Sequence, residues 1–235
     1  MVEINLRGPA KNALGSEMLS WVLERLQAAH GEPVLLTGSR DAFSAGLNLK
    51  EVASLDPAGM EGYLRLLERC MAAVYLHPAP VVAAIEGHAI AGGCVLAACC
   101  DHRVATTDGR VRIGLNEVAL GVRYPPRVLH IVRDRVPRPA HEMVLLGAGL
   151  FPPSEARAHG LVDELAEDAL GVARARLATL AAHPREAYAA TKRAMRGATD
   201  ADLAPDEAED RWLRESVPVW TSKAVKERVL AVLKK

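Results

Sequence analysis

The sequence has few aromatic residues and no excess of either positive or negative charge. Only 4% of the 235 residues are aromatic although half are hydrophobic, and 29 basic residues balance 29 acidic ones. The balance argues against a dedicated nucleic-acid-binding protein, which usually carries a basic excess. No run approaches the ~18 apolar residues of a membrane span, and the first residues lack the basic and apolar regions of a signal peptide. We therefore expect a cytoplasmic protein that binds neither nucleic acid nor membrane.

Metal-binding and familiar nucleotide-binding patterns are missing as well. The four cysteines are Cys70, Cys94, Cys99 and Cys100, and no two of them have C-x-x-C spacing, so we predict buried thiols and no metal site. The sequence has no G-x-x-x-x-G-K-[ST], G-x-S-x-G, H-E-x-x-H or G-x-G-x-x-G after a strand. The simplest phosphate-loop, hydrolase, zinc-protease and dinucleotide-binding classes are therefore removed.

The pattern of apolar residues predicts an α/β core followed by a helical tail. Up to about residue 125, short apolar runs alternate with segments of helical spacing, which is typical of α/β proteins. After that point strand signals nearly vanish. We expect strands at Val2–Leu6, Pro33–Thr37, Val81–Ile85 and His102–Thr106. We expect helices at Ser16–Ala29 (with Ser16 as N-cap), Gly59–Leu76, Gly92–Cys100, Pro126–Arg135, Pro139–Leu146, Pro153–His159, Leu170–Ala182, Arg185–Arg196 and Lys223–Leu233, and a loop at Gly38–Asn48.

Two glycine-containing loops carry the chemical signal. Asp41-Ala-Phe-Ser-Ala-Gly-Leu-Asn-Leu-Lys-Glu51 follows a predicted strand, and Ile85-Glu-Gly-His-Ala-Ile-Ala-Gly-Gly-Cys-Val-Leu96 follows another and opens a helix. Glycine lets the backbone approach a ligand closely, and a helix N-terminus presents unpaired N–H groups. If the two loops converge, they offer two N–H donors to one developing oxyanion. Each loop alone is equally consistent with an ordinary strand-to-helix turn.

The two loops, with their flanking segments, resemble the crotonase (enoyl-CoA hydratase/isomerase) superfamily. The resemblance covers essentially the whole chain, and its pieces occur in the family's order. They are Arg7-Gly-Pro-Ala-Lys-Asn-Ala-Leu14, Ala42-Phe-Ser-Ala-Gly-Leu-Asn-Leu-Lys50, Glu86-Gly-His-Ala-Ile-Ala-Gly-Gly-Cys94, Cys100-Asp-His-Arg-Val-Ala105, Ile113-Gly-Leu-Asn-Glu-Val-Ala-Leu-Gly121 and Pro153-Ser-Glu-Ala-Arg-Ala-His-Gly-Leu-Val-Asp163.

The resemblance implies an α/β spiral of ββα units over residues 1–180 and a C-terminal helical region over residues 181–235 that mediates trimerisation. The expected assembly is a homotrimer or a dimer of trimers. The implied ligand is an acyl-coenzyme A thioester, so coenzyme A enters with the substrate and no separate cofactor is expected. The backbone N–H groups of Leu47 and Gly92 are implied to stabilise a thioester enolate. The resemblance also assigns the substrate-binding residues Ala45, Gly46, Asn48, Lys50, Gly93 and Val95. Tyr124 departs from the small residues that many members have at its position, so we expect it either to line the acyl pocket and bind substrate or simply to pack.

The acid–base positions distinguish reactions within that family. Members that act as hydratases resemble one another in having two glutamates, and the corresponding positions here are Val95 and Glu117. Adding water needs a group that activates the water and a proton source for carbon, whereas moving a double bond needs a single base. Because Glu117 is the single glutamate at these two positions, the sequence favours a Δ3,Δ2-enoyl-CoA isomerase. Two alternatives stay open: a hydratase or other lyase with a second acid elsewhere, and a weakly active acyl-CoA-binding protein.

Overall fold

The computed structural model describes residues 1–196 and 207–234, and its strands form two sheets. The larger sheet is parallel, with the order β1-β2-β4-β6-β9. The smaller has the order β3-β5-β7-β8, in which only the β7–β8 pair is antiparallel. The larger sheet contains β1 (Val2–Asn5), β2 (Val34–Thr37), β4 (Val81–Ile85), β6 (His102–Thr106) and β9 (Glu164–Ala166), and the smaller contains β3 (Ala42–Ser44), β5 (His88–Ile90), β7 (Ile113–Gly114) and β8 (Leu150–Phe151).

The chain alternates between the two sheets, and helices follow each pair of strands. The strand pairs β2–β3, β4–β5 and β6–β7 each place one strand in the larger sheet and the next in the smaller one, which is the predicted ββα repeat. The early helices are α1 (Pro9–Asn12), α2 (Ser16–Ala28), α3 (Leu49–Ser54), α4 (Pro57–Tyr75), α5 (Gly92–Ala98), α6 (Glu117–Leu120) and α7 (Pro126–Arg135).

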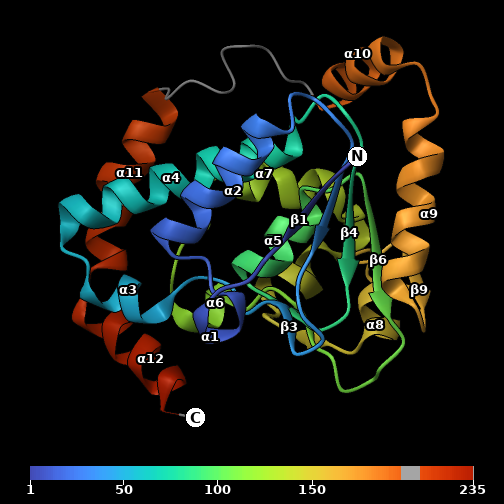
Figure 1. Cartoon of the computed structure of the whole chain (residues 1–235). Helices are drawn as coiled ribbons and strands as arrows, with labels where there is room; N and C mark the ends of the chain where they lie inside the picture. The colour runs from blue at the N-terminus through green and yellow to red at the C-terminus, as the bar shows by residue number, and fades with distance from the viewer. Residues whose placement is uncertain (197–206, 235) are drawn as a thin grey trace.

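Helices cover both faces of the larger sheet (Figure 1). On one face, α9 (Ala169–Ala181) packs Ala169, Ala173 and Leu177 against Leu35, Val82 and other strand residues. On the other face the main core includes α2, α4 and α5. Parallel strands buried on both faces read as continuous apolar runs, which explains why Val81–Ile85 was recognisable from sequence. The remaining helices are η1 (Arg138–Ala140), η2 (Glu142–Leu146), α8 (Pro153–Ala158), α10 (Arg185–Met195), α11 (Glu207–Trp220) and α12 (Lys223–Leu233).

Some predicted elements were wrong in detail. Ser16 is not the N-cap of α2: Gly15 holds that position, and the Ser16 hydroxyl donates instead to Glu51. The predicted loop Gly38–Asn48 contains strand β3, and the tail contains the short strands β8 and β9. The predicted helix Pro139–Leu146 is a 3₁₀ turn followed by a π-helix.

The division of the chain at residue 180 stays a prediction. Residues 197–206 and 235 of the predicted C-terminal region lie outside the described residues. In the part of the chain that the structure describes, that region holds α10, α11 and α12, together with the end of α9. Within the same described ranges, no helix is both long enough and apolar enough to cross a lipid bilayer.

Candidate active site

The two glycine loops converge, as the sequence predicted. Gly46 has a φ of +90°, which favours glycine, and a methyl group added there would lie 2.7 Å from the Ile90 carbonyl oxygen and 3.3 Å from the Gly92 nitrogen. A methyl group added at Gly92 would in turn lie 2.9 Å from Cδ2 of Leu47. The absence of side chains at both glycines therefore allows the two backbones to meet.

The local hydrogen bonds direct two backbone N–H groups away from their own segments. Leu14 forms a parallel bridge with Leu47. In this bridge the Leu14 N–H donates to the Gly46 carbonyl oxygen, and the Asn48 N–H donates to the Leu14 carbonyl oxygen. This pattern uses the neighbours of Leu47 and turns its own N–H to the opposite side. Gly92 is the first residue of α5, where helical N–H groups have no partner within the helix. The two groups are thus placed to donate to a ligand.

Backbone strain marks the entry to α5. Ala91, the N-cap, has φ 49° and ψ −124°, a region that residues with a side chain rarely adopt. Its N–H donates to the Gly114 carbonyl over 2.8 Å, which anchors the strained residue to β7. The smaller sheet therefore holds the turn that orients the Gly92 N–H.

Glu117 supplies the carboxyl group of the site. It is the first residue of α6, only 8% of its surface is exposed, and its Oε2 accepts a hydrogen bond from the Tyr124 hydroxyl over 2.9 Å. Burial raises the pKa of Glu117 to about 7, although hydrogen bonds from its own backbone N–H, from the Tyr124 hydroxyl and from the Asn116 N–H oppose that rise. A carboxyl group that titrates near neutrality can both accept and return a proton.

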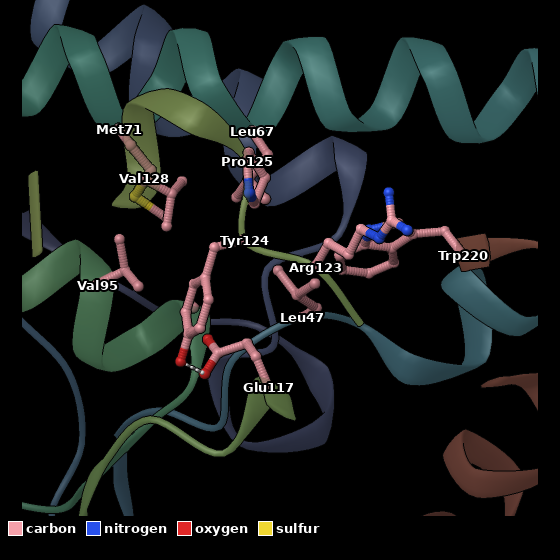
Figure 2. Close-up of a pocket in the computed structure, with 11 residues that line it drawn as sticks. Leu47, Leu67, Met71, Val95, Glu117, Arg123, Tyr124, Pro125, Val128 and Trp220 are labelled. Carbon is pink, nitrogen blue, oxygen red and sulfur yellow. Dashed lines mark hydrogen bonds between the residues drawn. The ribbon is translucent and has the colours of Figure 1, made fainter. Parts of the chain in front are cut away.

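One small cavity, of about 20 Å³, is lined by Leu47, Gly92, Val95, Glu117 and Tyr124. Figure 2 shows the Tyr124 ring between Val95 and Leu47, with its hydroxyl directed at the Glu117 carboxyl. Most of the wall is apolar, which is typical of sites that bind small organic ligands, and Glu117 is the one carboxyl group that the described residues contribute to it. The other lining residues are Leu67, Met71, Arg123, Pro125, Val128 and Trp220.

These other lining residues were not predicted from the sequence to belong to the site. Leu67 and Met71 come from α4, Val128 from α7 and Trp220 from α11. Their helical spacing predicts burial but is the same for any core-facing residue, so the sequence holds no signal that separates them from the core. Only the tertiary packing brings these helices to the cavity.

The other predicted substrate-binding residues lie within the two glycine loops and do not line this cavity. The Ala45 N–H donates to Lys11, the Asn48 side chain caps α3, and Lys50 is exposed on α3. Gly93 packs against β3, where an added methyl group would lie 2.3 Å from the Ser44 carbonyl oxygen. Their roles toward a substrate stay predictions. Among the described residues, no group of three or more His, Cys, Asp and Glu side chains is arranged to hold a metal ion.

The alternation between two sheets and the converging glycine loops place the protein in the crotonase class of α/β folds. Its sequence matches the family model described as enoyl-CoA hydratase/isomerase over residues 1–227. The chain belongs to the enoyl-CoA hydratase/isomerase family, and the family supports an acyl-CoA thioester as the substrate. The predicted family, fold class and enzyme class are therefore confirmed.

Relatives with both kinds of activity resemble this chain. It is 33% identical over 207 residues to human mitochondrial enoyl-CoA delta isomerase 1, covering 85% of this chain and 68% of that protein. It is 30% identical over 214 residues to 2,3-dehydroadipyl-CoA hydratase of Escherichia coli K12, covering 88% and 82%. The crystal structure of human mitochondrial delta3-delta2-enoyl-CoA isomerase superposes with a TM-score of 0.90 at 30% identity, covering 99% and 93%. The family alone therefore does not select the reaction.

Proposed function

We propose that this protein is a Δ3,Δ2-enoyl-CoA isomerase in which Glu117 carries the proton. The observation that supports this most strongly is the composition of the cavity. Among the described residues that line it, Glu117 is the one carboxyl group, and the position where hydratases of the family resemble one another in having a second glutamate is Val95. The similarity to an isomerase over most of the chain also supports this choice.

The proposed reaction moves one proton between two carbons. The Glu117 carboxylate removes a proton from C2 of a 3-enoyl thioester, and the C–H electron pair passes into the thioester carbonyl to form an enolate. The N–H groups of Leu47 and Gly92 stabilise that oxyanion, an interaction worth ~3–4 kcal/mol per donor. Glu117 then returns the proton to C4 while the double bond moves to C2–C3. No atom is gained or lost.

The hydratase alternative requires a second acid, and the two carboxylates that end or follow the first glycine loop, Glu51 and Asp56, have other partners. Oε1 and Oε2 of Glu51 accept hydrogen bonds from the Ser16 N–H over 3.3 and 3.1 Å, and Oε1 also accepts one from the Ser16 hydroxyl. The Asp56 carboxylate caps α4 by accepting from the Gly59 N–H over 2.7 Å. Each carboxylate thus accepts hydrogen bonds from the first turn of a helix, which supports the single-base reaction.

The remaining contacts of the substrate are proposed on the same basis. Coenzyme A arrives as part of the thioester, with no separate cofactor, and its pantetheine arm runs along Ala45, Gly46 and Asn48 toward the exposed Lys50. Gly93 holds α5 in place behind the thioester. The acyl group lies against Val95 and Tyr124 in the apolar cavity. The active assembly is a homotrimer or a dimer of trimers, with contacts made by the C-terminal helices.

An absorbance assay with two substrates tests the proposed function. Isomerisation of a 3-enoyl-CoA creates a double bond conjugated with the thioester, so absorbance rises. Hydration of a 2-enoyl-CoA destroys that conjugation, so absorbance falls. We expect the wild-type protein to give the first signal much faster than the second. Rapid loss of the 2-enoyl signal would instead support the hydratase, and tight binding of both thioesters with neither signal would support a binding protein.

A further inference from the structure

Tyr124 is built to meet Glu117 across a tight turn. The two residues lie seven positions apart, on either side of Gly121, whose φ of +74° reverses the chain at the end of α6. The Val122 N–H donates to the Glu117 carbonyl over 3.2 Å and closes that turn. Tyr124 then lies over the carboxyl group, and its hydroxyl donates to Oε2 over 2.9 Å (Figure 2).

We propose that Tyr124 is a positioning residue whose hydroxyl holds Oε2 of Glu117 and so assigns the proton transfers to Oε1. This inference rests on the proposed function for its effect on turnover. Its effect on the carboxyl group itself is independent of which reaction the enzyme performs. A carboxyl group fixed at one oxygen can take a proton from one carbon and release it to another without rotating about its own bond.

The Glu117 carboxyl group interacts with the backbone N–H groups of Glu117 and Asn116, and Tyr124 supplies the side-chain hydrogen bond to it. From α5, the Cys94 thiol interacts electrostatically with Glu117, and burial raises the pKa of that thiol to about 12, so it stays neutral. Arg123 also lines the cavity, but it lies 4.0 Å from Glu215 of α11 in an ion pair. From α12, the Arg228 guanidinium lies against Gly121, at the turn rather than at the carboxyl.

The hydrogen bond has a predictable electrostatic consequence. A donor to a carboxylate favours the charged form and lowers its pKa, whereas burial favours the neutral form. Burial has the larger effect on Glu117, so its pKa is raised, and the hydrogen bond from Tyr124 offsets part of that rise. Removing the hydroxyl must therefore raise the pKa of Glu117 further, and the carboxylate that acts as the base becomes available only at higher pH.

Tyr124→Phe removes the hydroxyl and keeps the ring. A matched control is Tyr75→Phe, which removes a tyrosine hydroxyl that donates to Asp134 over 2.6 Å, away from the residues that line the cavity. The carboxyl carbons of labelled glutamates are followed by ¹³C NMR during a pH titration of the ligand-free protein. The Glu117 resonance is assigned by its absence in Glu117→Gln.

We expect the Glu117 midpoint to move up by about one pH unit in Tyr124→Phe and to stay in place in Tyr75→Phe. Turnover of a 3-enoyl-CoA by Tyr124→Phe should then fall about fivefold at pH 7 and recover at higher pH, with little change in KM. An unchanged Glu117 midpoint in Tyr124→Phe overturns the inference. A shifted midpoint in a protein that isomerises no 3-enoyl-CoA supports the inference and removes the proposed function instead.

Discussion

The buried carboxyl group of Glu117 matters both for the proposed proton transfer and for the stability of the folded protein. Its pKa lies at about 7 in the folded protein, above the ordinary value of 4.5, because its charged form is buried. The folded state therefore binds this proton more tightly than the unfolded state. The resulting contribution to stability is full below about pH 4.5 and is lost as the pH rises toward 7.

Glu117→Gln should remove this pH dependence, because the amide keeps the shape of the side chain and does not ionise. Relative to wild type, the free energy of unfolding of Glu117→Gln should increase by about 2 kcal/mol between pH 5.5 and pH 8. Urea unfolding at the two pH values measures the difference. If the two proteins differ by the same free energy of unfolding at both pH values, Glu117 is ionised throughout this range and its burial does not shift its pKa.

Individual residues of the site differ in how far the sequence foretold them. Leu47, Gly92, Val95 and Glu117 were predicted from positions that match a family pattern, whereas Tyr124 departs from that pattern. The structure gathers all five at one cavity. The hydrogen bond between Tyr124 and Glu117 was not predicted. It depends on the turn at Gly121, and no pattern in the sequence gives the direction of a side chain after such a turn.

At the scale of elements, α5 is placed by its glycines. Gly93 has no room for a side chain, since an added methyl group would lie 2.3 Å from the Ser44 carbonyl oxygen of β3. Backbone atoms in a paired strand do not yield as a flexible side chain does. The close approach of α5 to β3 therefore fixes the position from which Gly92 presents its N–H.

Gly93→Ala should destabilise the protein by about 1–3 kcal/mol, because it overpacks the contact between α5 and β3. Gly62→Ala is the matched control, since Gly62 is exposed within α4 and an added methyl group there meets nothing within 4 Å. That control should stabilise the protein by about 0.4–1 kcal/mol. Chemical denaturation of both variants checks the pair, and an equal change of the same sign in both would contradict the packing account.

The elements that sequence reasoning missed are short or lack periodicity. Strands β3, β5, β7, β8 and β9 have two or three residues each, too few to show an alternating pattern. Helix α3 has six residues, and α11 contains Pro218 in its interior, which argues against a helix. The long helices α4 and α9 were predicted to within a few residues because their apolar spacing extends over several turns.

At the scale of the whole molecule, a segment near the C-terminus completes the cavity. Trp220, at the end of α11, lines a pocket whose proposed catalytic residues, Leu47, Gly92 and Glu117, lie in the first half of the chain. The last helix also carries apolar side chains at its surface: Leu230, Val232 and Leu233 are 46, 44 and 42% exposed. Exposed apolar side chains gathered on one helix are typical of surfaces that meet another chain.

The proposed assembly predicts a mass of three or six times the 25.2 kDa of one chain. Size-exclusion chromatography with light scattering measures this mass directly. A trimer would bury the apolar side chains of α12 and give a mass that does not change on dilution through the micromolar range. A mass of one chain at all concentrations would contradict the proposed assembly without affecting the chemistry proposed for Glu117.

The most direct test of the account is the fate of a 3-enoyl-CoA in deuterium oxide with wild-type protein and with Glu117→Gln. Mass spectrometry of the product reports both conversion and deuterium incorporation, and calorimetry with a saturated acyl-CoA reports binding. We predict that the wild type forms the 2-enoyl product, while Glu117→Gln binds the thioester nearly as well but neither converts it nor exchanges its C2 protons. Conversion by Glu117→Gln at the wild-type rate would contradict the central claim.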